Sequence, residues 1–301
     1  SLREHGYGER FASGLITSSG AIAAVIPPSL VMILYGASAE ESIAALFLGG
    51  LLPGLTIGFM IALYVVYHAW RHGIREGGRF DFGVFLSATR RGAWALGTPV
   101  IILGGIYAGI FSPTEAAGVA GVYALFVTLF VYAEIDLRGV WDVAATSVKL
   151  TSQIMVIVAA AGVFSWLLTI SGVPQGMVAF IRDIDAEPWV VLIVINIFLL
   201  AVGCLIDPAS ALLILTPLLV PIANSIGVDL VHFGIIMTVN LSIGMFTPPF
   251  GLNIFVTQSL FSVPVAQIYR GLLPFIAIQI AALAIITYFP PLTLYLPRML
   301  N

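Results

Sequence analysis

Long apolar segments recur from one end of this 301-residue sequence to the other, and they constrain its fold more than any other feature. A helix needs roughly 20 apolar residues to cross the hydrocarbon core of a bilayer. Soluble domains carry about 25% charged residues, whereas this sequence has 9% charged and 60% hydrophobic residues. Outer-membrane barrels alternate polar and apolar residues in much shorter segments. The sequence therefore predicts an all-α polytopic membrane protein, with apolar segments at 11–37, 42–69, 93–112, 114–133, 151–171, 188–206, 209–223, 232–261 and 273–297.

The segments 188–206 and 209–223 are separated by Asp207 and Pro208 and can be read in two ways. They form either two full spans or one re-entrant hairpin. The second segment holds only about 15 residues before Asn224, which is short for a crossing that needs roughly 20. We therefore favour a hairpin with its tip near Asp207, and we expect about eight transmembrane spans besides it.

The arginines give an expected orientation. The linker 70–92 is the most positive part of the chain, so the positive-inside rule places it in the cytoplasm. The acid-rich stretch 172–187 then lies outside. Two pieces, 81–91 and 136–148, have both charged and apolar faces and are predicted to be interfacial helices. The linker arginines are Arg71, Arg75, Arg79, Arg90 and Arg91.

Several classes of protein are poorly supported. Cys204 is the only cysteine, so an internal disulfide is impossible. The net charge is −3 and there is no basic block, so a nucleic-acid partner is not expected. The sequence has no serine-nucleophile elbow, Walker loop or dinucleotide fingerprint. We therefore expect neither an enzyme nor an ATP-driven pump, and no metal site beyond Na⁺.

Two stretches of the chain share an unusual pattern. "TSSGAIAAVIPPSLVMILYG" (17–36) and "NLSIGMFTPPFGLNIFVTQS" (240–259) each place a polar, glycine-containing cluster before a Pro-Pro pair and a short apolar half-helix. By the expected orientation, the two stretches cross the membrane in opposite directions. Paired, interrupted helices of inverted topology indicate the binding site of a secondary transporter.

The chemistry of such breaks follows from the backbone groups that they release. A proline in a helix interior costs about 3 kcal/mol and frees a carbonyl one turn earlier. At membrane depth, freed groups are tolerated only where they face protein or a watery cavity. C-terminal carbonyls of half-helices suit Na⁺, whereas N-termini suit a carboxylate. Ser19, Asn240 and Thr247 can add side-chain oxygens. The alternative is a pair of proline kinks that neighbouring helices satisfy.

Two acidic residues stand between apolar runs. Asp207 is the only acid between residues 188 and 228, and an ionisable residue at membrane depth is a candidate for function. It can also cap the helix that starts at Pro208, and the two roles are compatible. Glu115 follows Ser112 at the spacing of a capping box, which favours a capped helix start there.

Four motifs in order resemble a known family: "GYGERFASGLITSSGAIAAVIPPSLVMILYG", "GIYAGIFSPTEAAGVAGVYAL", "DPASALLILTPLLVPIA" and "GMFTPPFGLNIFV". Together they are similar to the large membrane subunit of tripartite ATP-independent periplasmic (TRAP) transporters, the DctM- or SiaM-like subunit. The resemblance covers nearly the whole chain. It implies the ion-transporter superfamily fold, with an inverted repeat and an elevator-type mechanism.

The resemblance also implies site residues. One sodium site would use Ser19, Gly20 and the carbonyls near Ile26 and Pro27. The other would combine the hairpin around Gly203 with the broken helix at Gly244, Thr247 and Phe250. We expect the substrate to be bound by Asp207, Ser210, Asn240, Pro248, Pro249 and Asn253.

The function implied by the resemblance is Na⁺-coupled import of small organic acids, such as a C4-dicarboxylate or a sialic acid, across the bacterial inner (plasma) membrane. Na⁺ is the coupling ion, and no organic cofactor is expected. The implied partners are a small, DctQ-like membrane subunit and a periplasmic, DctP-like substrate-binding protein. The alternatives are a stand-alone divalent-anion/sodium symporter of similar fold, and a channel or non-transporting membrane scaffold.

The resemblance further divides the chain into regions. We expect 1–69 to be the end of a first repeat, 70–92 a basic arm, 93–150 scaffold helices, and 151–301 the second repeat with hairpin 188–223. The serine-rich hairpin that completes the first sodium site precedes the segment that "EHGYGERF" resembles. We therefore expect this chain to be the C-terminal portion of a longer protein.

Overall fold

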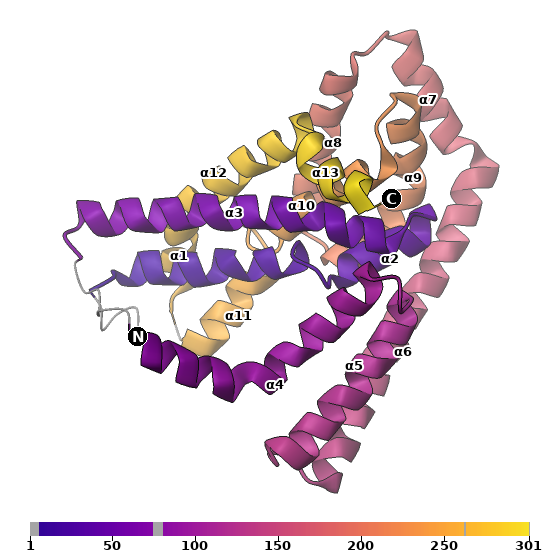
Figure 1. The fold of residues 1–301 in the computed structure, drawn as a ribbon. Coiled ribbons are helices and arrows are strands. Elements are labelled where there is room, and N and C mark those ends of the chain that lie inside the picture. Colours follow the sequence, from indigo (N-terminus) through magenta and orange to yellow (C-terminus); the bar gives the residue numbers. More distant parts are fainter. Residues whose placement is uncertain (1–5, 75–80, 262, 301) are drawn as a thin grey trace. The chain divides into compact units, whose positions relative to one another are not determined.

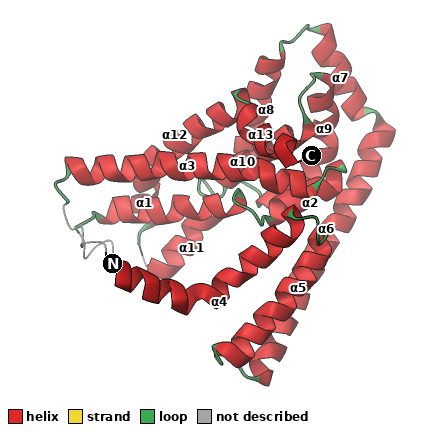
Figure 2. Cartoon of the chain, viewed as in Figure 1, coloured by secondary structure: helices red, strands yellow, loops and turns green. Residues whose placement is uncertain are grey.

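The computed structural model describes residues 6–74, 81–261 and 263–300. All regular elements in these ranges are helices, as Figure 2 shows. Arg75 and Arg79 of the predicted basic linker lie outside the described residues. The helices are α1 Glu9–Ser19, η1 Gly20–Ala24, α2 Leu30–Ala39, α3 Ile43–Arg71, α4 Phe82–Tyr107, α5 Pro113–Phe126, η2 Val127–Val131, α6 Leu137–Ser171, α7 Val173–Asp183, α8 Pro188–Gly203, α9 Pro208–Ser225, α10 Leu230–Gly244, α11 Leu252–Phe261, α12 Val265–Tyr288 and α13 Pro291–Leu300.

Five of the described helices are long and apolar enough to cross a membrane: α3, α5 with η2, α6, α9 and α12. Helices α2, α8, α10 and α11 are apolar but shorter. The prediction of an all-α polytopic membrane protein is confirmed. The number of eight spans and the re-entrant course of 188–223 stay predictions. Helix α9 runs for 18 residues, so the shortness of the second segment no longer argues against a full span.

Three expected boundaries are wrong. The pieces 81–91 and 136–148 are not separate helices, because they are continuous with the apolar segments that follow in α4 and α6. The junction of the second piece has no glycine or proline to stop the helix. Conversely, the segment 273–297 is two helices, because Pro290 and Pro291 interrupt it and hold Phe289 in a non-helical conformation. Helix α7 lies in a stretch that we expected only to be an exterior connection.

The chain divides into two compact units. One comprises residues 1–76 and 161–301, and the other comprises residues 77–160. The helices on both sides of each Pro-Pro break belong to the first unit. Its centre is α10, whose residues 232–244 are buried on every face. Helices α2, α3, α8, α9 and α12 pack around α10 and account for this burial (Figure 1).

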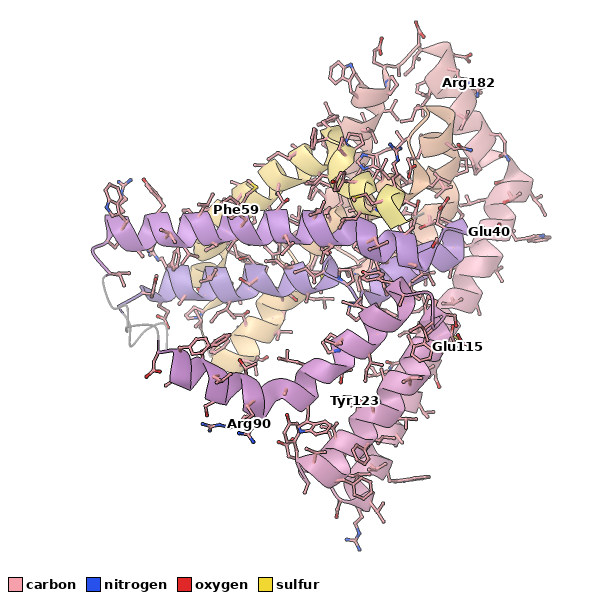
Figure 3. The ribbon with its side chains drawn as sticks, viewed as in Figure 1. Glu40, Phe59, Arg90, Glu115, Tyr123 and Arg182 are labelled. Atoms are coloured by element: carbon pink, nitrogen blue, oxygen red, sulfur yellow. The ribbon has the colours of Figure 1, made fainter. Side chains whose placement is uncertain are left out.

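Helices α1 and α3 meet through aromatic rings in the first unit. The ring of Phe11 on α1 stacks on the ring of His68 on α3, with the centroids 3.7 Å apart. The other face of α3 is exposed and apolar, and Figure 3 shows Phe59 on this helix. Leu55, Phe59 and Leu63 follow one another at four-residue spacing, and Phe59 is 64% exposed. Such a stripe is costly in water but favourable against lipid tails.

The second unit is built around the pair α4 and α5. Ser112 accepts from the backbone N–H of Glu115, and the Glu115 carboxylate accepts from the backbone N–H of Ser112 at 2.8 Å. The predicted capped start of α5 is therefore confirmed as a full capping box. The hydroxyl of Tyr123 on α5, labelled in Figure 3, donates to the carbonyl of Trp94 on α4 at 2.8 Å.

Candidate functional site

The first interruption follows the end of α1. The helix continues as the short 3₁₀ turn η1 and ends before Pro27, and α2 starts after the N-cap residue Ser29. The Ser29 hydroxyl donates to the carbonyl of Ala24 and accepts from the backbone N–H of Met32. One side chain thus satisfies a released carbonyl on one side of the break and a released N–H on the other.

The second interruption separates α10 from α11. The backbone N–H of Asn253 donates to the carbonyl of Met245 at 2.9 Å, across the gap between the two helices. The hydroxyl of Tyr269 donates to the carbonyl of Pro249 at 2.8 Å. Both predicted helix breaks are therefore confirmed, and in both the Pro-Pro peptide bond is cis.

The loop between α8 and α9 lies against the second break. The backbones of Gly203 and Gly244 approach so closely that a Cβ atom on Gly244 would overlap the carbonyl group of Gly203. Beside this contact is a cavity of about 210 Å³, lined by residues 203–208, Met245 and residues 250–252. Of the predicted site residues, the structure thus brings together Gly203, Asp207, Gly244 and Phe250.

Four helix ends meet at this cavity. Helices α8 and α10 end there, at Gly203 and beside Met245, and α9 and α11 begin there, at Pro208 and Leu252. Helix C-termini carry about half a negative charge and N-termini about half a positive charge. The cavity is therefore bordered by partial charges of both signs, supplied mainly by backbone groups.

Thr247 and Ser19 have the same local geometry at the two breaks. The Thr247 hydroxyl donates to the carbonyl of Ile243 at 2.7 Å, and the Ser19 hydroxyl donates to the carbonyl of Leu15 at 2.6 Å. Each side chain thus uses its single hydrogen on the carbonyl four residues earlier. The lone pairs of each oxygen stay available to accept a hydrogen bond or to coordinate a cation.

Asp207 caps α9. One of its carboxylate oxygens accepts from the backbone N–H of Ser210 at 2.9 Å. This confirms the capping role that the Asp-Pro pair predicts, with Pro208 in the first turn. Because Asp207 also lines the cavity, the cap leaves open the second role, contact with an ion or a substrate.

Asn240 is fully buried in α10. It does not line the 210 Å³ cavity, and neither do the predicted site residues Ser210, Thr247, Pro248, Pro249 and Asn253. Its side-chain NH₂ donates to the side-chain oxygen of Asn196 at 2.7 Å and to the carbonyl of Ile236 at 2.9 Å. Asn196 in turn donates to the hydroxyl of Thr287 at 3.1 Å. Asn240 thus belongs to a buried polar network between α8, α10 and α12.

Sequence reasoning missed Gln279, and it assigned Asn253 to the substrate without its bond to α1. The side-chain amide of Gln279 donates to the carbonyl of Ser18 at 3.2 Å, and the side-chain amide of Asn253 donates to the carbonyl of Thr17 at 3.3 Å. Gln279 is the only side-chain amide in the apolar segment 273–297. A lone amide in such a segment needs a partner, and this was the available signal.

The sequence matches the family profile of the tripartite ATP-independent periplasmic transporter, DctM component, over residues 1–292. This chain belongs to the DctM family. The matched region contains both broken helices and the loop at 203–208. As a DctM-family permease, the chain is an inner-membrane protein, and its class is a transporter subunit rather than an enzyme.

Named relatives of this DctM-family chain differ in their substrates. It is 41% identical to the C4-dicarboxylate TRAP transporter large permease protein DctM of Pseudomonas aeruginosa, over 98% of this chain and 69% of that protein. It is 37% identical to the ectoine TRAP transporter large permease protein TeaC of Halomonas elongata, over 97% and 68%. It is 35% identical to the sialic acid TRAP transporter large permease protein SiaM of Vibrio cholerae, over 99% and 70%.

Proposed function

We propose that this chain forms the transport pathway of a sodium-coupled TRAP secondary transporter that imports a small organic acid. The observation that carries this proposal is the cavity at the second break, where Gly203 and Gly244 bring two helix C-termini together. Family membership supports the transport role.

The chemistry of the cavity favours a monovalent cation. Its negative potential comes from the carbonyl ends of α8 and α10, and Asp207 is the only acidic residue in its lining. Divalent cations usually need several carboxylates. Neutral oxygens at half-helix ends are the ligands that transporters use for Na⁺. Thr247 lies at the second break but outside the cavity lining, and in this proposal its hydroxyl, whose lone pairs are free, also coordinates the ion.

The same cavity suits the carboxylate of an organic acid. The N-termini of α9 and α11 supply backbone N–H groups and positive partial charge. In this proposal the substrate is bound by Asp207, Ser210 and the Pro248–Pro249 turn. The proposal names a substrate class and no single acid, because the relatives are named for chemically different compounds.

The proposed transport cycle includes two partners and a large movement. A small membrane subunit and a periplasmic substrate-binding protein are expected from membership of a tripartite family. The movement is an elevator-type displacement of the broken helices, which we expect from the sequence resemblance.

Uptake by the reconstituted complex tests this proposal. The full-length subunit, its small partner and its binding protein are placed in liposomes, and uptake of labelled organic acids is measured under an inward Na⁺ gradient or an equal choline gradient. We expect saturable uptake that requires both Na⁺ and the binding protein. Equal uptake in choline contradicts sodium coupling, uptake without the binding protein indicates a stand-alone symporter, and non-saturable flux indicates a channel.

A further inference from the structure

Asn253 touches both helix breaks. It is the second residue of α11, directly after the second break, and its backbone N–H donates to the carbonyl of Met245 at 2.9 Å. Its side-chain NH₂ donates to the carbonyl of Thr17 at 3.3 Å, in the last turn of α1. The residue therefore closes the turn of one interrupted helix and binds the end of the other.

The approach between Asn253 and the first break is close. A Cβ atom built on Gly20 would lie 3.1 Å from the side-chain nitrogen of Asn253. Gly20 is the residue at which α1 gives way to η1. A side chain at position 20 would crowd the amide, so glycine permits the contact at this position.

A second contact fixes the same pair of helices. Thr257, one turn after Asn253 on α11, lies with its hydroxyl oxygen 2.8 Å from that of Thr17. Thr17 and Thr257 are both buried. The amide of Asn253 is therefore aligned with the end of α1 by a buried hydroxyl pair.

We infer that Asn253 is a positioning residue that couples ion binding at the two breaks. This inference rests on the proposed function, since it concerns the sodium sites proposed above. An ion that orders the turn 245–252 also orders Asn253, because the backbone of Asn253 closes that turn. The ordered amide then holds the Thr17 carbonyl in place, so the second ion binds to a break that is already arranged. When the first ion orders a segment that the second ion also needs ordered, the second ion binds more tightly. This is positive cooperativity.

Gln279 provides the matched control. Its side-chain amide also donates to a last-turn carbonyl of α1, that of Ser18 at 3.2 Å. Gln279 lies on α12, however, which forms neither side of either Pro-Pro break. If the amides merely cap α1, loss of either one has the same effect. If Asn253 links the breaks, only its loss uncouples them.

The experiment measures Na⁺-dependent thermal stability of the purified, full-length complex, with choline chloride keeping the ionic strength constant. The Tm is followed against Na⁺ concentration in the wild type, Asn253→Leu and Gln279→Met, and each curve is fitted for a midpoint and a Hill coefficient. We expect a wild-type Hill coefficient above 1, the same coefficient in Gln279→Met, and a coefficient near 1 in Asn253→Leu. We also expect Asn253→Leu to keep its stabilisation by Na⁺.

Each other outcome has a distinct meaning. A wild-type coefficient in Asn253→Leu, a coefficient of 1 in the wild type, or an equal loss in Gln279→Met overturns the coupling role. A wild type that Na⁺ stabilises no more than choline contradicts the proposed function itself. If Asn253→Leu does not fold, Asn253→Ser replaces it, since the shorter polar side chain cannot reach Thr17 and is easily solvated.

Discussion

The backbones of Gly203 and Gly244 are in direct contact, and this contact joins the end of α8 to the end of α10 beside the cavity. No side chain fits between them. In the proposed function, the two helix C-termini are thereby close enough to act on the same ion. A side chain on Gly244 would force them apart.

Substitution of Gly244 by alanine tests this contact. The added methyl group would overlap the carbonyl of Gly203, and overpacking of this kind typically costs about 1–3 kcal/mol. We expect Gly244→Ala to lower the Tm and to weaken stabilisation by Na⁺. Gly58→Ala is the control, because a Cβ atom at Gly58 in α3 meets nothing within 4 Å. An unchanged Tm in Gly244→Ala would show that the two helices are not in contact.

The hydroxyl of Thr247 is expected to act on the ion. Thr247→Ala removes that oxygen and its bond to the carbonyl of Ile243. We expect a several-fold rise in the Na⁺ concentration that half-saturates uptake. Thr169→Ala removes an equivalent bond, from Thr169 to the carbonyl of Ser165 at 2.9 Å in α6, which forms neither side of either break. If both variants change the Na⁺ dependence equally, Thr247 has only a structural role.

His232 holds α10 against the junction of α12 and α13. One ring nitrogen lies 2.7 Å from the hydroxyl of Thr293, and the other lies 3.1 Å from the carbonyl of Thr287. The ring is buried, so its replacement by leucine leaves both oxygens without this partner. Loss of a buried partner costs about 1–3 kcal/mol. We expect His232→Leu to lower the Tm by several degrees without changing the half-saturating Na⁺ concentration.

A double-mutant cycle with Thr293→Val then separates the two bonds of His232. If the Thr293 bond contributes, the combined variant loses less stability than the sum of the two single variants. Strictly additive losses would mean that the 2.7 Å contact contributes no coupling energy.

Glu41 is expected to make stability depend on pH. It lies between α2 and α3, outside the apolar helices, and burial, with a further contribution from Asp229, raises the pKa of its carboxyl above the ordinary 4.5. A raised carboxyl pKa means that the folded state favours the protonated form. The contribution of the Glu41 carboxyl to the stability of the folded state is complete below its unfolded-state pKa. It is lost as the pH rises through the folded-state pKa.

The measurement is the Tm against pH for the wild type and Glu41→Gln. We expect the variant to be more stable than the wild type above the folded-state pKa, and the difference to shrink as the solution is acidified. Glu40→Gln, which removes the same charge from an exposed neighbouring position, is the charge-matched control. A difference that grows on acidification would contradict the direction of the pKa shift.

Local patterns in the sequence were sufficient for several features of the fold. Apolar segment length indicates membrane helices, and the Pro-Pro pairs predict both breaks because a proline cannot donate to the preceding turn. Likewise, the spacing of Ser112 and Glu115 predicts the cap of α5. The same local reasoning failed at 273–297, where hydrophobicity hid the break at Pro290, and at 136–171, where charge suggested a boundary that the backbone does not have.

The sequence by itself therefore determined the class of protein, the positions of the breaks and the family. Only the tertiary structure decided which groups meet at those breaks. The contact of Asn253 with Thr17 joins residues 236 positions apart, and that of Gly203 with Gly244 joins two different helices. Such pairings depend on how whole helices pack, and no local propensity encodes them. At most, a lone amide or a glycine in the sequence indicates that such a contact exists, and it does not identify the partner residue.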